Sequence, residues 1–297
     1  MKFILIILLF SITLSSVQAY DYPVWPSVLT KDSLFYRGQN TGYISFKQLI
    51  KMLKGEKDIF IKSRFFRTIQ KIKPELTNTE ISLLIDQQVE HWKKQGMIWQ
   101  ILECHADTYG CSMPTVKSLM GVVIKANELP YEIDTVFQRQ ESGGRNYLSL
   151  AETNKVLSFF DPVVSTSYDI KIAKRFMRDS EKNLGYVLYL KDINHRNCSE
   201  RLKSKADCFI NHEEYLEELE VPFMGYVNTS ELFGFESHGV IVSKKNNAVY
   251  VKNINTKEQL KLQTQFTAKD QCQLYNKKLQ QIVTFKKLAD QMVSTCH

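Results

Sequence analysis

The spacing of apolar residues divides the chain into a helical front and a β-rich back. Between about 44 and 130, apolar positions recur with mostly helical periodicity. One helical face ends just before Gly55 and consists of Phe46, Leu49, Ile50 and Leu53. Thr77 and Glu80 form a capping box, which indicates that a further helix begins there. The front is therefore predicted to be several helices with a shared apolar core.

From about 155 onward the pattern changes to short runs typical of strands. A short strand is also expected at Leu34–Tyr36, ahead of the helical front. The expected back strands are Tyr186–Leu190, Leu219–Phe223 and a hairpin of Val240–Ser243 with Ala248–Asn253. One helix, Ile170–Arg178, is expected among them, and the tail from about 268 to 294 is again helical. This order predicts an α+β fold rather than a doubly wound parallel sheet.

The first 19 residues have the order of a secretory signal peptide. Lys2 precedes an apolar run from Phe3 to Leu14, and small residues end the segment at Ala19. The apolar run is shorter than the roughly 20 residues that span a bilayer. We therefore expect a secreted protein without a stable membrane anchor. Its predicted parts are the signal peptide (1–19), one domain (20–267) and a C-terminal helical tail (268–297).

The composition is that of an ordinary globular protein, with 43% hydrophobic and 24% charged residues in 297. The formal net charge of +7 is compatible with nucleic-acid or membrane binding. No nucleic-acid-binding motif accompanies it, so no nucleic-acid partner is expected. Neither a GxGxxG loop after a strand nor a Walker loop is present.

The cysteines predict disulfides rather than a metal site. An even number of them in an exported chain is typical of a disulfide set. Neighbouring pairs would be Cys104 with Cys111, Cys198 with Cys208, and Cys272 with Cys296, although six cysteines allow 15 connectivities. The sequence has no CxxC pair. We therefore expect no metal.

Two acidic residues and a hydroxyl-rich motif mark the β-rich half. If Glu218-Leu219-Glu220 is a strand, its two carboxylates project from one face, because side chains alternate along a strand. Such a pair is unfavourable unless a cation or a developing positive charge lies above it. The motif Ser165-Thr166-Ser167 follows two valines and precedes the helix that carries Ala173 and Phe176.

The order of these features resembles the R-S-E class of mono-ADP-ribosyltransferases. The matching elements are Phe35-Tyr36-Arg37-Gly38, Ser165-Thr166-Ser167, the strand Tyr186–Leu190 and Glu218-Leu219-Glu220-Val221. That class includes the cholera- and pertussis-like toxins and the vertebrate ecto-enzymes. The resemblance covers residues about 34 to 40 and 155 to 240. It implies a split β-sandwich around an NAD cleft, to which the helical segment 44–130 is added.

The resemblance also implies a role for each matching residue. Glu220 would hydrogen-bond the ribose 2′-hydroxyl of NAD and stabilise the cation that forms there, and Ser165 would orient Glu220. Glu218 would hold the acceptor, which is arginine when this residue is a glutamate. Arg37 would clamp a phosphate through its planar guanidinium. The implied NAD-binding residues are Arg37, Gly38, Ser165, Thr166 and Ser167, and the implied catalytic residues are Ser165, Glu218 and Glu220.

Two questions stay open at the level of sequence. The first is which arginine binds NAD, because Arg37 lies 128 residues before Ser165 whereas Arg139 lies only 26 before it. The Tyr-Arg-Gly context favours Arg37. The second is the activity itself. The expected activity is ADP-ribosylation of an arginine-bearing target protein by a bacterial toxin or an ecto-enzyme. The alternatives are NAD glycohydrolysis at the same site and a secreted binding protein without catalysis.

Overall fold

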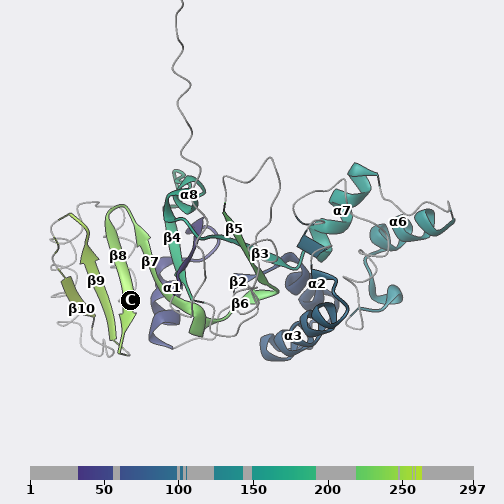
Figure 1. Cartoon of the computed structure of the whole chain (residues 1–297), viewed down its shortest axis with the longest axis horizontal. Coiled ribbons are helices and arrows are strands. Elements are labelled where there is room, and N and C mark those ends of the chain that lie inside the picture. The colour runs from purple at the N-terminus through teal and green to yellow at the C-terminus, as the bar shows by residue number, and fades with distance from the viewer. Residues whose placement is uncertain are drawn as a thin grey trace, which may run out of the picture.

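The computed structural model confirms an α+β fold built on a large antiparallel sheet (Figure 1). It describes residues 33–55, 61–98, 101–102, 105, 124–142, 149–191, 219–246, 248–255, 257 and 259–262. The predicted signal peptide, the six cysteines, Glu218 and the predicted tail helix lie outside these residues. Within them, no helix is long and apolar enough to cross a membrane.

The helices in the described residues are α1 (Phe46–Lys54), α2 (Arg64–Ile72), α3 (Asn78–Lys94), α6 (Tyr131–Ser142), α7 (Leu150–Phe160) and α8 (Ile170–Arg175). The first strands are β1 (Phe35–Asn40), β2 (Ile61–Lys62), β3 (Val163–Ser167), β4 (Gly185–Leu190) and β5 (Glu220–Met224). The later strands are β6 (Tyr226–Val227), β7 (Leu232–Ser237), β8 (Val240–Lys245), β9 (Ala248–Asn253) and β10 (Gln259–Leu262).

Eight strands form the main sheet in the order β10-β9-β8-β7-β4-β1-β3-β5, and every neighbouring pair is antiparallel. Strand β4 is buried at all its positions, because helices cover both of its faces. Tyr186 and Leu188 belong to the core that contains α1, whereas Val187 and Tyr189 face α8. Because side chains alternate along a strand, β4 packs against α1 with one face and against α8 with the other.

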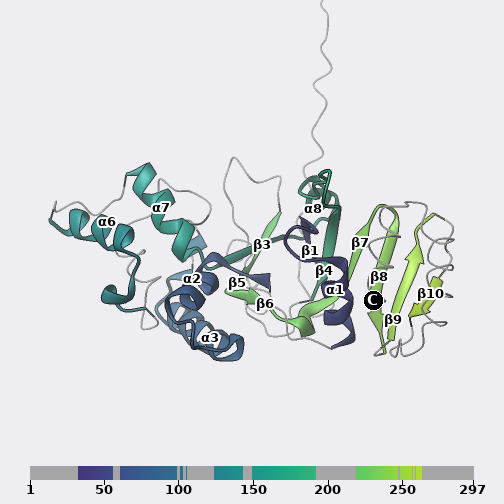
Figure 2. The same cartoon turned by 180° about the vertical axis from the view of Figure 1, so that it is seen from behind.

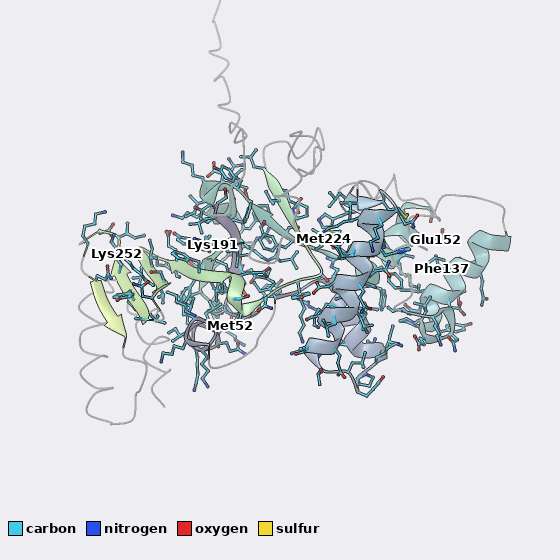
Figure 3. All side chains as sticks on the ribbon, turned by 60° about the horizontal axis from the view of Figure 1, so that its bottom comes forward. Met52, Phe137, Glu152, Lys191, Met224 and Lys252 are labelled. Atoms are coloured by element: carbon cyan, nitrogen blue, oxygen red, sulfur yellow. The ribbon has the colours of Figure 1, made fainter. Side chains whose placement is uncertain are left out.

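Helices α2, α3, α6 and α7 form a second core beyond the β3–β5 end of the sheet (Figures 1 and 2). Large side chains fill it, including Phe65, Phe66, Trp92 and Phe160. Met224 at the end of β5 packs into this core and lies where the sheet meets the helices (Figure 3). The sheet and the helical part therefore share a continuous apolar boundary.

The local signals at the front of the chain are confirmed. Ser45 caps α1, and Gly55 ends it in the left-handed conformation that glycine adopts readily. The capping box of Thr77 and Glu80 opens α3 as predicted. The boundary between the halves was placed too early, because α6 and α7 extend the helical part to Phe160. Helix α8 is shorter than expected and ends at Arg175.

Gly38 of β1 lies directly against the end of α8. A Cβ atom at this position would lie 2.0 Å from the Ala173 carbonyl oxygen and 2.8 Å from the Met177 nitrogen. Both atoms belong to the backbone, so neither can move without displacing α8. Lys174 of α8 also forms an ion pair with the buried Glu236 of β7, at 2.6 Å. The glycine therefore sets how closely α8 approaches the sheet.

The Gly38→Ala variant should lose stability by about 1–3 kcal/mol, because the added methyl group overpacks a backbone contact. Urea unfolding would measure the loss. Gly42→Ala is the matched control: its Cβ would meet only side-chain atoms of Asn40 and Asn183, at 3.0 and 3.1 Å. Equal stability of the two variants would contradict this account of Gly38.

Candidate functional site

A cleft opens in the main sheet where β1 and β3 separate. The two strands pair at a single position, Tyr36 opposite Ser167, whereas β3 pairs with β5 over five residues. The β3–β5 pair therefore diverges from β1 beyond that position. The cleft has a volume of about 270 Å³. It is lined by Tyr36, Arg37, Gly38, Ser165, Thr166, Ser167, Ala173, Phe176 and Glu220.

Arg37 bridges the separated strands. Its Nη1 donates a hydrogen bond to the main-chain carbonyl of Ser165. Among the described residues, its buried Nε has no hydrogen-bond partner. Burial lowers the pKa of the Arg37 guanidinium, and the nearby Glu220 carboxylate opposes that change. Arginine nevertheless stays protonated in proteins. A cation that lines a cleft and keeps a donor without a partner is suited to bind an anion there.

The Ser-Thr-Ser motif forms most of β3. Thr166 Oγ1 donates to the main-chain carbonyl of Val221, which ties β3 to β5. Ser167 Oγ accepts from the Asp169 amide at 3.1 Å, just before α8 begins. Both hydroxyls are buried and serve the backbone. Ser165 differs, because its hydroxyl lies 3.3 Å from Nε2 of a histidine, His105, that contacts two of the cleft residues.

Glu220 is the first residue of β5, and a backbone kink precedes it. Leu219 has a φ of 43°, in the left-handed region that a bulky residue rarely adopts. Its side chain is buried, and its carbonyl accepts from the Tyr168 amide at 3.1 Å. The predicted strand Leu219–Phe223 is therefore confirmed except at its first residue, because β5 begins at Glu220. Because the alternation of side chains breaks there, it does not place Glu218 on the same face as Glu220.

His105 is the site residue that sequence analysis missed. Its Nδ1 lies 2.9 Å from Asp161 Oδ1. Its Nε2 lies 3.3 Å from Glu220 Oε1 and 3.3 Å from Ser165 Oγ. It therefore links Ser165 to Glu220. No motif surrounds it, and it precedes Ser165 by 60 residues and Glu220 by 115, so no local pattern could have paired them.

The surroundings of His105 favour its charged form. Burial is the largest influence and lowers its pKa, but the carboxylates of Asp161 and Glu220 outweigh it and raise the pKa to about 10. Asp161 is itself held in place, because its Oδ1 accepts from the Val163 amide at 3.0 Å. Its main-chain carbonyl accepts from the Phe65 amide at 2.9 Å. The imidazolium thus lies between two carboxylates, one of them fixed by backbone.

Arg139 lies elsewhere. It belongs to α6, its side chain is 63% exposed, and its Nη2 lies 3.5 Å from Glu152 Oε1. Of the two arginines considered from the sequence, Arg37 lines the cleft with Ser165 and Glu220, whereas Arg139 is not among the cleft residues. The segment Thr135–Arg139 is helical and supplies no strand to the sheet.

No family model, no curated protein and no solved structure matches this chain. A carboxylate and a guanidinium line the same space, so it can receive a ligand that carries both an anionic group and a centre of positive charge. The hydroxyl and imidazole groups beside Glu220 can fix the direction of that carboxylate.

The pKa of His105 predicts how stability depends on pH. Because the folded protein binds this proton more tightly than the unfolded chain, whose histidine pKa is about 6.5, the stabilisation is complete below that value. The free energy of unfolding should fall as the pH rises from about 6.5 to about 10. His105→Gln should flatten this slope in urea titrations at a series of pH values. An unchanged slope in the variant would contradict the assignment.

Proposed function

We propose that this protein is an NAD-dependent mono-ADP-ribosyltransferase of the R-S-E class, which transfers ADP-ribose to arginine side chains of a target protein. The observation that carries the proposal is the meeting of Arg37, Ser165 and Glu220 in one cleft. Arg37 and Ser165 are 128 residues apart in the chain. These three residues were predicted as site residues from sequence motifs alone, which carry no information on distances in space.

The chemistry of the transfer fits the charges in the cleft. The N-glycosidic bond of NAD breaks with its electron pair leaving on nicotinamide, which gives an oxocarbenium-like centre at the ribose. The Glu220 carboxylate would stabilise this centre and accept the ribose 2′-hydroxyl proton in a hydrogen bond. A nitrogen of the acceptor guanidinium then forms the new bond to the ribose carbon and loses one proton to solvent.

The NAD diphosphate would bind on the Arg37 side of the cleft. A buried guanidinium with an unused Nε–H is a stronger phosphate ligand than an ammonium group, since its planar donors can contact two oxygens. Three further residues would shape the NAD site through the backbone and would not contact NAD with their side chains. Gly38 allows α8 to approach β1 closely. The hydroxyls of Thr166 and Ser167 hydrogen-bond to the backbone of β5 and of the segment before α8. The opening of the antiparallel sheet at β1 and β3 supports a split β-sandwich around NAD.

Arginine is the proposed acceptor because Glu218 precedes Glu220 by two residues. A second carboxylate would attract the guanidinium of the target. The signal-peptide pattern at the N-terminus supports action outside the secreting cell, as a toxin or an ecto-enzyme.

Incubation of the mature protein with labelled NAD and poly-arginine should transfer label to the polymer. Glu220→Ala should lower the transfer rate by about 10²–10³-fold, because the developing positive charge loses its carboxylate. Release of nicotinamide without labelled polymer or labelled lysate protein would indicate NAD glycohydrolysis instead. Absence of turnover would leave a binding protein.

The same assay can test the acceptor side of the site. In the Glu218→Gln variant we expect nicotinamide release to persist while transfer to arginine is lost. Transfer equal to that of the wild type would contradict the role proposed for Glu218.

The two arginines can be separated by NAD binding. Arg37→Lys should weaken NAD binding about tenfold or more, which corresponds to about 1.4 kcal/mol, because lysine cannot reproduce the planar contact. Isothermal titration calorimetry would measure the affinity. Arg139→Lys is the matched control and should bind NAD like the wild type. The reverse result would assign the phosphate contact to Arg139.

A further inference from the structure

We infer that His105 and Asp161 form a positioning pair that holds the Glu220 carboxylate in the orientation required for catalysis. This inference rests on the proposed function, in which Glu220 stabilises the ribose cation. His105 would not touch NAD itself. It would act through one oxygen of Glu220, leaving the other oxygen for the substrate.

The geometry of the three groups supports this role. A protonated His105 donates through Nδ1 to Asp161 Oδ1 and through Nε2 toward Glu220 Oε1. Ser165 Oγ is a second acceptor at the same Nε2. The side chains of Asp161, His105 and Glu220 are only 12%, 16% and 12% exposed, so little water competes for these contacts. The imidazole is therefore fixed at both nitrogens.

The charges around the pair favour positioning over proton transfer. Among the residues that the structure describes, the charged groups that face His105 are the carboxylates of Asp161, after α7, and Glu220, on β5. Arg37 on β1 adds a positive charge near Glu220, and Arg67 on α2 acts on Arg37 in turn. The charges of the His105 imidazolium and the Asp161 carboxylate cancel. The three groups His105, Asp161 and Glu220 together therefore carry one negative charge. A histidine that already holds its proton cannot accept another from the incoming arginine.

The pair also joins the two parts of the molecule at the catalytic carboxylate. Ile101 and Leu102, in the helical turn before His105, are buried in the core of the helical part. Phe65 of α2 donates its amide to the Asp161 carbonyl. Glu220 and Ser165 belong to the sheet. The helical part therefore supplies the support for a carboxylate that the sheet provides.

The charge and contact of His105 can be measured without turnover. NMR titration of the full mature protein, labelled with ¹⁵N at histidine, should show His105 titrating far above 6.5, near 10. Glu220→Gln and Asp161→Asn should each lower that midpoint. A midpoint near 6.5 that neither variant moves would overturn the inference, whether or not the protein uses NAD.

Kinetic measurements distinguish a positioning role of His105 from a role in folding stability alone. His105→Gln should lower kcat for nicotinamide release by about 10²-fold while KM for NAD changes little, since misplacement of a reacting group by about 1 Å has such an effect. The wild-type kcat should also decline on the alkaline side near pH 10, and this limb should be absent in the variant. Asp161→Asn should also lower kcat, but its alkaline limb should move to lower pH, because His105 is still present and loses the carboxylate that raises its pKa.

His238→Gln is the matched control. His238 Nε2 lies 2.7 Å from Asp179 Oδ2, so this variant also breaks a histidine–aspartate contact. The hydrogen bonds of this pair to Ser237 and Gly185 involve no residue that lines the cleft, whereas His105 contacts Glu220 and Ser165, which do. It should keep the wild-type kcat and pH profile. If the wild type turns over NAD and His105→Gln has the same kcat and pH profile as the wild type, this inference is overturned while the proposed function stands. If the wild type shows no turnover, the proposed function fails, and the catalytic role of the pair fails with it.

Discussion

The hydrogen bond from the Arg37 guanidinium to the Ser165 carbonyl replaces the pairing that β1 and β3 lose beyond Tyr36 and Ser167. An opened sheet exposes backbone groups that require partners, because a buried carbonyl without one is costly. The arginine provides that partner from within the gap. The cleft can therefore persist in the folded protein, with its cation held beside Glu220 rather than extended into solvent.

Two cores pack against the strands that border this gap. The core that contains α1 includes side chains from β1, β4, β3 and β5, namely Phe35, Leu188, Val164 and Phe223, whereas the helical core reaches the β3–β5 end of the sheet through Val163 and Met224. The β3–β5 pair is therefore held by both cores. His105 and Asp161 connect the helical core to the Glu220 carboxylate. The orientation of Glu220 therefore depends on how the helices pack.

Sequence predicted what depends on local signals and missed what depends on distant contacts. The helix caps at Ser45 and Thr77 and the strand pattern of Tyr186–Leu190 are encoded within a few residues, and the structure contains them. The Ser-Thr-Ser motif was found in the same way. His105 could not be found, because tertiary packing alone brings it to Glu220. The predicted strand at Leu219–Phe223 began one residue too early, because β-propensity does not register a left-handed residue.

The left-handed Leu219 directly precedes Glu220 and interrupts the extended backbone at that point. Such a conformation costs a non-glycine residue about 1–2 kcal/mol, and here its buried side chain and its bond to Tyr168 maintain it. Glu220 is registered by the ladder with β3, and Glu218 precedes the kink in the chain. The place of Glu220 in the sheet is thus set by its pairing with β3 and by the Leu219–Tyr168 bond, independently of which residue stands at position 218.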